Sequence, residues 1–533
     1  MDNYPFYYAS RLPILFYVAV AYLVISSFLV KNLKIRIALV LLLATLVEFT
    51  PVVMLTNPWV PDQYPFSAEP ALLAKNHHLS RFHYLDTTPA LALTFSGVLL
   101  SSNTNGLMLW QLAPIFGVVS TLLVILIGNK IKTNGVICGL LFLAFNFLYQ
   151  TNIFHRQTYS FVLFLLSILI LLYIIDSKKS VLSLVYIAVL FAIVLSHPGT
   201  SAFLIISLFI VAIGMLFFNK NRKLFLLTII SAVIFFFYYT YLSIWDLSRM
   251  IHLVRSAMNE FLSGDVGQIK GLEYLAGYTT TFGVIINVRT FVIVAYIGLS
   301  SLIAFYILLK RHDLTSQFVS LLHFGFAISL VAFMFGGAFY QLRPLMFLIP
   351  TSSFLIGKFL TMISTLHENK ARFRKSQKKL ATMILKFRTI RNPIKGLSIL
   401  CLVLMFLALP ILRYSGLPYL HPPSQELTAK LYLDRYYGYN SPINVTERNL
   451  PYAYSLILMW IKPEGEPPIV FYPEKEIDMK KGYFTTFRYT TRDAYWISEV
   501  SFAGYVDELL ISLPESHNLV YQSDHYHKIF LKK

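Results

Sequence analysis

Acidic residues are scarce in the first 413 positions of this 533-residue chain, which hold only 12 of its 26 Asp and Glu side chains. Four of these carboxylates, Glu48, Asp62, Glu69 and Asp86, lie in or near one polar segment. The same segment contains His77, His78 and His83. Carboxylates near imidazoles can transfer protons or bind a divalent cation. The spacing matches no diagnostic metal motif, and a solvated loop with histidines at a membrane surface has the same composition. Both interpretations stay open from the residues alone.

Basic and imidazole side chains recur where later apolar runs begin. Three short polar segments carry them: His155-Arg156-Gln157, Ser196-His197-Pro198 and Gln341-Leu342-Arg343-Pro344. If the apolar runs cross a membrane, as argued below, Arg156 and Arg343 lie on the face from which arginine is usually depleted. An arginine retained there indicates an anionic partner, and a phosphate is the natural one. For each arginine by itself, anchoring a helix among lipid headgroups is an equally good interpretation.

Glu48 differs from the other three carboxylates because it lies inside an apolar run. A carboxylate within a membrane span is costly and usually faces a cavity or a partner. Glu48 is about two helical turns from the outer end of its run. It is therefore expected either to line a site or to reach back to water.

The elements that must position these residues are transmembrane helices. Hydrophobic residues make up 56% of the chain, charged residues only 13%, and the mean hydropathy is +0.62. So much apolar surface cannot be buried in a water-soluble core of this size. The 44 Phe and 34 Tyr suit helix packing and the aromatic belts of a bilayer. We therefore expect a mainly α, multi-pass protein of the cell membrane.

Twelve apolar runs approach the roughly 20 residues that span a bilayer: 12–30, 37–55, 107–128, 134–153, 159–175, 180–196, 200–218, 224–243, 288–309, 318–338, 345–364 and 396–413. Basic residues follow every odd-numbered run, so the positive-inside rule makes those loops cytoplasmic and places both termini outside. Pro89–Leu100 is apolar but only about half a span. We expect it to be re-entrant or interfacial; as a full span it would raise the helix count to thirteen.

Three connections are too long to be simple turns. The loops 56–88 and 244–287 are predicted to be external, whereas 366–395 is a cytoplasmic linker with ten Lys and Arg. Such a basic stretch is typical of a helix on anionic headgroups, at about 1 kcal/mol per basic residue. The net charge of +19 has no nucleic-acid-binding module beside it. We therefore expect membrane lipids, and no nucleic acid, as partners.

The composition changes after residue 413, where the predicted membrane domain (1–413) ends. Residues 414–533 carry 12 basic and 14 acidic groups and are predicted to form a small extracytoplasmic α/β domain. A helix is expected at Glu426–Tyr437, and strands are expected at Pro468–Tyr472, Asn518–Gln522 and His525–Leu531. Asn444-Val445-Thr446 is a glycosylation sequon, which suits an external domain.

The order of these features resembles the GT-C superfamily of polyprenyl-phosphate-dependent membrane glycosyltransferases, which includes protein O-mannosyltransferases and oligosaccharyltransferases. The resemblance rests on Asp62 in the first external loop, on Tyr84-Leu85-Asp86-Thr87-Thr88-Pro89, on Arg343 at a late helix, and on the external C-terminal domain. The junction 195–200 and the last residues, 518–530, are most similar to uncharacterised archaeal members. The resemblance covers most of the chain, through short and degenerate motifs.

This resemblance implies transfer of a sugar from a polyprenyl-phosphate-linked donor to a glycan, lipid or protein acceptor at the extracytoplasmic face. It gives Asp62 the role of base or metal ligand and Arg343 contact with the lipid-linked phosphate, with Arg156 and His197 as further phosphate ligands. The secondary candidates are Glu69, Asp86, Glu48 and His155. A divalent cation is the cofactor to consider, but no Asp-x-Asp or Glu-x-Asp pair follows the second run. The lack of a Trp-Trp-Asp-like motif argues against an oligosaccharyltransferase proper.

Two other functions fit the same composition. A transporter or flippase for a lipid-linked or polyanionic substrate predicts inverted repeats and paired broken helices, and the sequence shows no internal repeat and little midplane charge. A non-catalytic surface-assembly protein would bind partners through its external domain. A pocket joining Asp62 and Arg343 at the outer face favours the enzyme, whereas a continuous polar path to the cytoplasm favours the transporter.

Overall fold

The computed structural model describes most helices of the membrane domain and, after them, five strands. The described residues are 9, 11–54, 66–67, 69–70, 73–74, 88–102, 106–146, 153–176, 180–219, 222–244, 247–248, 251, 255, 281–310, 313–334, 343–374, 396, 399–413, 443–445, 470–471, 483–486, 517–522 and 528–532. Asp62, Asp86 and the helix expected at Glu426–Tyr437 lie outside them.

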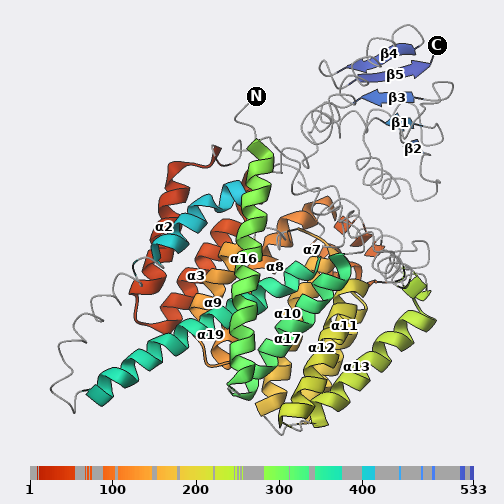
Figure 1. Ribbon diagram of the computed structural model, residues 1–533. Helices are drawn as coiled ribbons and strands as arrows, with labels where there is room; N and C mark the ends of the chain where they lie inside the picture. The colour runs from red at the N-terminus through yellow and green to blue at the C-terminus, as the bar shows by residue number, and fades with distance from the viewer. Residues whose placement is uncertain are drawn as a thin grey trace, which may run out of the picture.

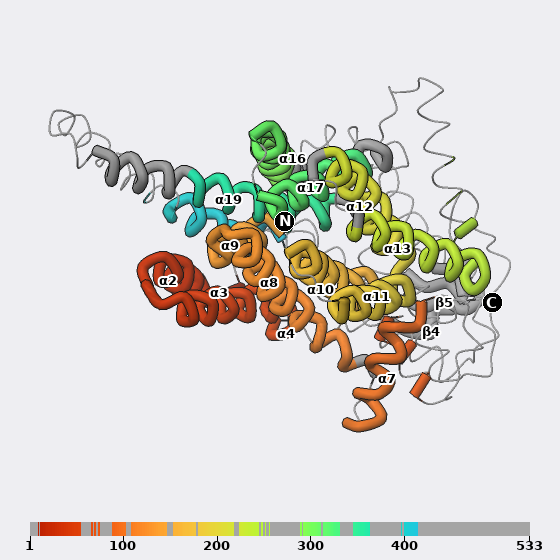
Figure 2. The backbone as a smooth tube through the Cα atoms, turned by 90° about the horizontal axis from the view of Figure 1, so that it is seen from below, coloured from red at the N-terminus to blue at the C-terminus, as the bar shows by residue number. Residues whose placement is uncertain are grey.

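The described part of residues 1–413 is a helix bundle (Figure 1). Its helices, in chain order, are α2 (Ile14–Leu29), α3 (Leu33–Glu48), α4 (Thr50–Met54), α7 (Ala90–Ser102), the 3₁₀ helix η2 (Gly106–Leu112), α8 (Ala113–Lys130), α9 (Gly135–Phe145), α10 (Arg156–Asp176), α11 (Val181–Val194), α12 (Pro198–Asn219), α13 (Arg222–Tyr241), α16 (Thr281–Leu309), α17 (Leu314–Met334) and α19 (Arg343–Arg374). A last helix covers Ile399–Arg413. Seen from below in Figure 2, α10 lies between α8 and α11 and contacts both.

The predicted multi-pass bundle is confirmed. Among the described helices, six are long and apolar enough to cross a membrane, and six more apolar helices have 10–17 residues. With α3, these helices coincide with the twelve predicted runs and with Pro89–Leu100. The segment Pro89–Leu100 corresponds to α7, whose 13 residues extend only about 20 Å. That length is too short for a hydrocarbon core of about 30 Å.

Three boundaries differ from the sequence-based expectation. The run predicted over 134–153 ends as a helix at Phe145, where the polar Asn146 follows and donates its backbone N–H to the Phe142 carbonyl at 2.9 Å. Helix α16 begins at Thr281, inside the loop predicted over 244–287. Helix α19 continues to Arg374, well into the predicted basic linker.

Polar caps fix where several helices begin. Asn32 accepts the Lys34 backbone N–H at 2.9 Å at the start of α3, and Asn134 accepts the Ile137 N–H at 3.3 Å at the start of α9. These bonds satisfy amides that the first helical turn leaves unpaired. In the α8–α9 turn Lys132 has φ 58°, the left-handed conformation that closes a helix end.

One end of the bundle gathers the loops predicted to be cytoplasmic. Lys130 pairs with Asp176 at 2.7 Å, which joins the ends of α8 and α10. Lys358 of α19 pairs with Asp313 at 2.9 Å and donates to the Ile131 carbonyl at 3.1 Å. Three basic loops therefore meet at one level of the bundle, as the alternation of basic loops predicts.

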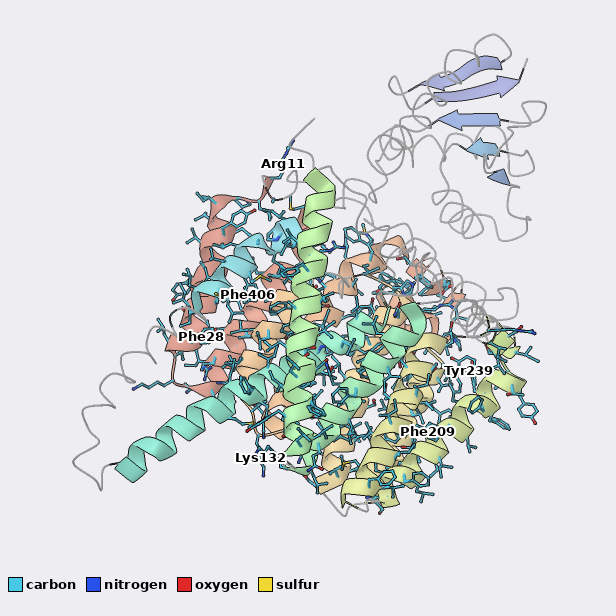
Figure 3. All side chains as sticks on the ribbon, in the orientation of Figure 1. Arg11, Phe28, Lys132, Phe209, Tyr239 and Phe406 are labelled. Carbon is cyan, nitrogen blue, oxygen red and sulfur yellow. The ribbon has the colours of Figure 1, made fainter. Side chains whose placement is uncertain are left out.

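Asp313 stays ionised in its ion pair with Lys358 although it is half-buried. Burial acts to raise the pKa of Asp313, but hydrogen bonds from Lys358 and Ser316 outweigh that effect and hold the pKa at about 2. Figure 3 labels Lys132 near this inner end and Arg11 at the opposite end of the bundle.

A buried polar seam joins α16, α17 and α19 inside the bundle. His323 of α17 is fully buried and lies 3.0 Å from the Ser301 hydroxyl of α16 and 3.0 Å from the Thr351 hydroxyl of α19. Hydrogen bonds between polar side chains are a common means of joining membrane helices. We interpret the seam as part of the scaffold.

The five strands after residue 413 form one mixed sheet in the order β2-β1-β3-β5-β4. Their bounds are β1 (Ile443–Val445), β2 (Val470–Phe471), β3 (Tyr483–Thr486), β4 (His517–Gln522) and β5 (Lys528–Lys532). The predicted strands correspond to β2, β4 and β5, with β5 starting three residues later than expected. Strands β1 and β3 were not predicted, because three or four residues are too few for a clear alternating pattern. The α/β character of the whole domain stays a prediction.

Candidate functional site

Arg156, the first residue of α10, is bound at three points. Its Nε donates to Glu69 Oε2 at 3.2 Å, its Nη2 pairs with Glu69 Oε1, and its Nη1 donates to the Thr88 hydroxyl. Both charged side chains are more than nine-tenths buried. Burial raises the pKa of Glu69, and the adjacent Arg156 guanidinium opposes that shift. Two candidate residues 87 positions apart are thus brought into contact.

An aromatic ring and two histidines lie beside this ion pair. The Arg156 guanidinium is 5.2 Å from the ring centre of Phe66, whose edge meets His155 at 4.3 Å between ring centres. The rings of His155 and His197 are 6.4 Å apart. We call this set the outer cluster; it consists of Phe66, Glu69, Thr88, His155, Arg156 and His197.

Each histidine of the outer cluster caps a helix. His155 Nδ1 accepts the Gln157 backbone N–H at 2.9 Å, and His197 Nδ1 accepts the Thr200 N–H at 3.0 Å. A ring nitrogen that accepts such a bond carries no proton, so the neutral ring is protonated at Nε2. Each neutral imidazole therefore carries its proton on Nε2, at the start of α10 or α12.

Three long helices begin side by side at this end of the bundle: α10, α12 and α19. Helices α10 and α19 run in the same direction, because Asp176 of α10 and Lys358 of α19 both lie at the opposite end. Below their first turns the Phe347 ring of α19 is 5.9 Å from Phe161 of α10 and 5.5 Å from Phe203 of α12. The first turns of the three helices therefore lie at one level.

Arg343 opens the third of these helices. It precedes Phe347 by one helical turn, as Gln157 precedes Phe161, so its backbone lies at the level of the outer cluster. The side chain of Arg343 lies outside the described residues. Helix N-termini each carry roughly half a positive charge, and three together make a favourable place for an anion.

Glu48 lies in a separate ion pair. Arg413, the last residue of the final helix, donates from Nη1 to Glu48 Oε1 at 3.1 Å and from Nη2 to Oε2 at 2.7 Å, and both side chains are 0% exposed. Gly117 of α8 makes room for them, since a Cβ there would lie 2.4 Å from Glu48 Cδ. The carboxylate expected to line a site or reach water instead links α3 to the last helix.

The described residues show no ready-made metal site. Among them no three His, Cys, Asp or Glu side chains gather as a ligand set, and Glu69 already pairs with Arg156. Asp62 and Asp86, the other carboxylates of the first external loop, lie outside the described residues. The roles predicted for Asp62 and Arg343 stay predictions.

The sequence analysis did not predict the contacts of three residues in the outer cluster and the Glu48 ion pair. Thr88 binds Arg156, Gln157 follows Arg156 in the first turn of α10, and Arg413 pairs with Glu48. Arg413 carried a usable signal, because a charged residue at the edge of an apolar run needs a partner. Thr88 and Gln157 are neutral polar residues whose neighbours are distant in sequence, so no local pattern distinguishes them.

No family model and no curated protein matches the sequence. Solved structures are similar in fold. ArnT from Cupriavidus metallidurans bound to undecaprenyl phosphate has a TM-score of 0.51 and 11% identity, over 92% of this chain and 97% of that chain. The oligosaccharyltransferase of Archaeoglobus fulgidus has a TM-score of 0.49 and 12% identity in its apo form, over 88% of this chain and 68% of that chain. Its complex with Zn and sulfate gives 0.47 and 14%, over 92% and 73%.

The likeness to ArnT extends over most of both chains, so the predicted GT-C-like helix bundle is confirmed at the level of the fold. At 11% identity with ArnT the likeness concerns the arrangement of the chain alone. What the protein does must therefore be argued from its own residues.

Proposed function

We propose that this multi-pass membrane protein of GT-C fold is a glycosyltransferase that uses a polyprenyl-phosphate-linked sugar donor at its extracytoplasmic face. The observation that supports it most is the convergence of α10, α12 and α19 at the outer cluster. Three helix N-termini at that level favour a phosphate there. ArnT, of similar fold, was solved with undecaprenyl phosphate bound.

The proposed reaction is a displacement at the anomeric carbon. Asp62 takes the proton of an acceptor hydroxyl or amide, and the acceptor atom forms its bond to that carbon. The bond from the anomeric carbon to the phosphate oxygen breaks, and its electron pair leaves with the polyprenyl phosphate. Arg343 and His197 stabilise the negative charge of the departing group.

The outer cluster changes the role proposed for Arg156. Its guanidinium is directed to Glu69 and Thr88, so we propose that it holds the loop residues in place and adds positive potential near the phosphate. Because Glu69 is engaged in that pair, a divalent cation would have Asp62 and Asp86 as its remaining carboxylate ligands in this loop.

The experiment is a transfer assay with the purified protein in lipid nanodiscs. A radiolabelled polyprenyl-phosphate hexose is supplied with a membrane extract as the source of acceptor, and release of polyprenyl phosphate is followed. We expect release that depends on the extract. In liposomes, movement of intact donor between leaflets without release would instead identify a flippase. If neither release nor movement occurs with any of a panel of hexose and pentose donors, the proposal is wrong.

A further inference from the structure

Gln157 presents a buried amide nitrogen that no described residue of the protein binds. It is the second residue of α10 and only 3% exposed, and its Nε2 has no hydrogen-bond partner among the described residues. Buried donors are nearly always paired, because an unpaired one loses its bonds to water without replacement. Its position in the first turn of a helix makes a missing ligand the simplest explanation.

The direction of the Gln157 side chain follows from the helix geometry. Gln157 lies one turn before Phe161, on the face that packs against Phe347 of α19 at 5.9 Å. Side chains on a helix lean toward its N-terminus. The amide is therefore directed to the outer end of the bundle, between the first turns of α10 and α19.

Other groups around this place also favour an anion. The helix N-termini of α10, α12 and α19 lie at this level, and His197 caps α12 by accepting the Thr200 N–H with its Nδ1. The hydroxyls of Thr158 and Ser67 are buried and likewise have no partner among the described residues. Ser67 adjoins Phe66, which contacts His155 and Arg156. Unpaired donors thus accumulate where the electrostatic potential is positive.

We propose that the Gln157 amide donates a hydrogen bond from Nε2 to a phosphate oxygen of the polyprenyl-phosphate donor. This inference rests on the proposed function and adds a residue to its substrate site. A neutral amide suits the task, since it fixes the orientation of the phosphate without adding charge. Gln157 orients the phosphate, and the three helix N-termini supply the potential.

The test measures binding of undecaprenyl phosphate and of undecaprenol, the same chain without phosphate, to the intact protein in detergent. Gln157→Glu keeps the shape of the side chain but replaces the donor with a carboxylate, and Gln157→Leu removes all hydrogen bonding. We expect at least tenfold weaker binding of the phosphate for both variants, as for other lost bonds to charged groups. Binding of undecaprenol should stay unchanged.

Ser207→Ala is the matched control, because the Ser207 hydroxyl is also buried and unpaired among the described residues but lies within α12, two turns below its start. It should leave both affinities unchanged. If wild type binds the phosphate and both Gln157 variants bind it equally well, the inference is wrong while the proposed function stands. Equal weakening for phosphate and alcohol would assign Gln157 a structural role and also overturn it. If wild type binds no polyprenyl phosphate, the proposed function fails first.

Discussion

Glu69 and Arg156 form a two-point ion pair that fastens the first external loop to the start of α10. The pair is more than nine-tenths buried, so each charge depends on the other for stabilisation. Thr88, two positions before α7, extends the contact toward that helix. The loop that carries Asp62 is therefore tied at two points to the start of α10, the helix that follows His155 and carries Gln157.

We predict that breaking this pair destabilises the protein strongly. Glu69→Gln or Arg156→Gln leaves a buried charge without its partner and should cost about 3–5 kcal/mol. The double variant, in which two amides replace the two charges, should cost much less than the sum. Thermal and denaturant unfolding in detergent measure the three changes. Asp176→Asn is the control: its pair with Lys130 is partly exposed and should contribute about 0–1 kcal/mol. Additive losses at Glu69 and Arg156 would show that the pair is not coupled.

Asp62 is predicted to be the residue most needed for turnover. Asp62→Asn keeps the size of the side chain but removes the base, and loss of a general base typically lowers the rate about 10²–10⁴-fold. The affinity for undecaprenyl phosphate should be unchanged, because Asp62 acts on the acceptor. Asp86→Asn serves as the comparison within the same loop. Near-normal turnover by Asp62→Asn together with an inactive Asp86→Asn would transfer the role to Asp86.

Arg343 is predicted to bind the donor phosphate through its two-pronged guanidinium. Pro344 follows it in the first turn of α19, where proline is well accommodated and the backbone N–H groups point toward the same anion. Arg343→Lys keeps the charge but loses bidentate binding, so the KM for the donor should rise about tenfold. A KM equal to that of wild type would place Arg343 outside the donor site.

Gly117 is predicted to be intolerant of even one added methyl group. A Cβ at Gly117 would overlap Glu48 Cδ at 2.4 Å, so Gly117→Ala must displace the carboxylate from Arg413. Overpacking alone costs about 1–3 kcal/mol, and the disturbed ion pair adds to it. The matched control is Gly97→Ala in α7, where nothing lies within 4 Å of an added Cβ. The result to compare is thermal stability in detergent: equal stabilities of the two variants would contradict the close packing.

Residues 414–533 are predicted to lie outside the cytoplasm, because their charge is near balance whereas the positive-inside rule assigns the basic loops to the cytoplasmic face. Protease added to intact cells should release this domain. Protease added to inverted vesicles should leave it protected and cut at the basic residues of 375–395. The opposite pattern would reverse the topology of the whole chain.

The positions of the helices were predictable because each must present roughly 20 apolar residues to lipid, a local property of the sequence. Contacts between helices were not. Arg413 was interpreted as the boundary of the last span, and its partner Glu48 lies 365 positions earlier. Several carboxylates could have paired with Arg413. Glu48 is the one that does, and it lies where α3 packs against α8.

For the site, the predicted roles stay predictions, but several of the candidate residues lie together. His155, Arg156, His197 and Glu69 were named as candidates, and the structure brings them together. The sequence could not reveal that Glu69 binds Arg156. The positive charge of Arg156 also suits a phosphate site, and the negative charge of Glu69 also suits a metal site. Gln157 had no signal in the sequence, since the role proposed for it comes from an amide nitrogen without a partner among the described residues.

The pair between Glu48 and Arg413 also constrains how the protein is made. A ribosome adds about 5–20 residues per second, so the 365 positions between the two residues take roughly 20–70 seconds to synthesise. Helix α3, with Glu48, thus enters the bilayer well before Arg413 has been synthesised. Biogenesis of the membrane domain is complete only when the final helix delivers Arg413 to Glu48. A chain cut short before that point keeps an uncompensated carboxylate among its helices, a defect that distinguishes unfinished molecules from finished ones.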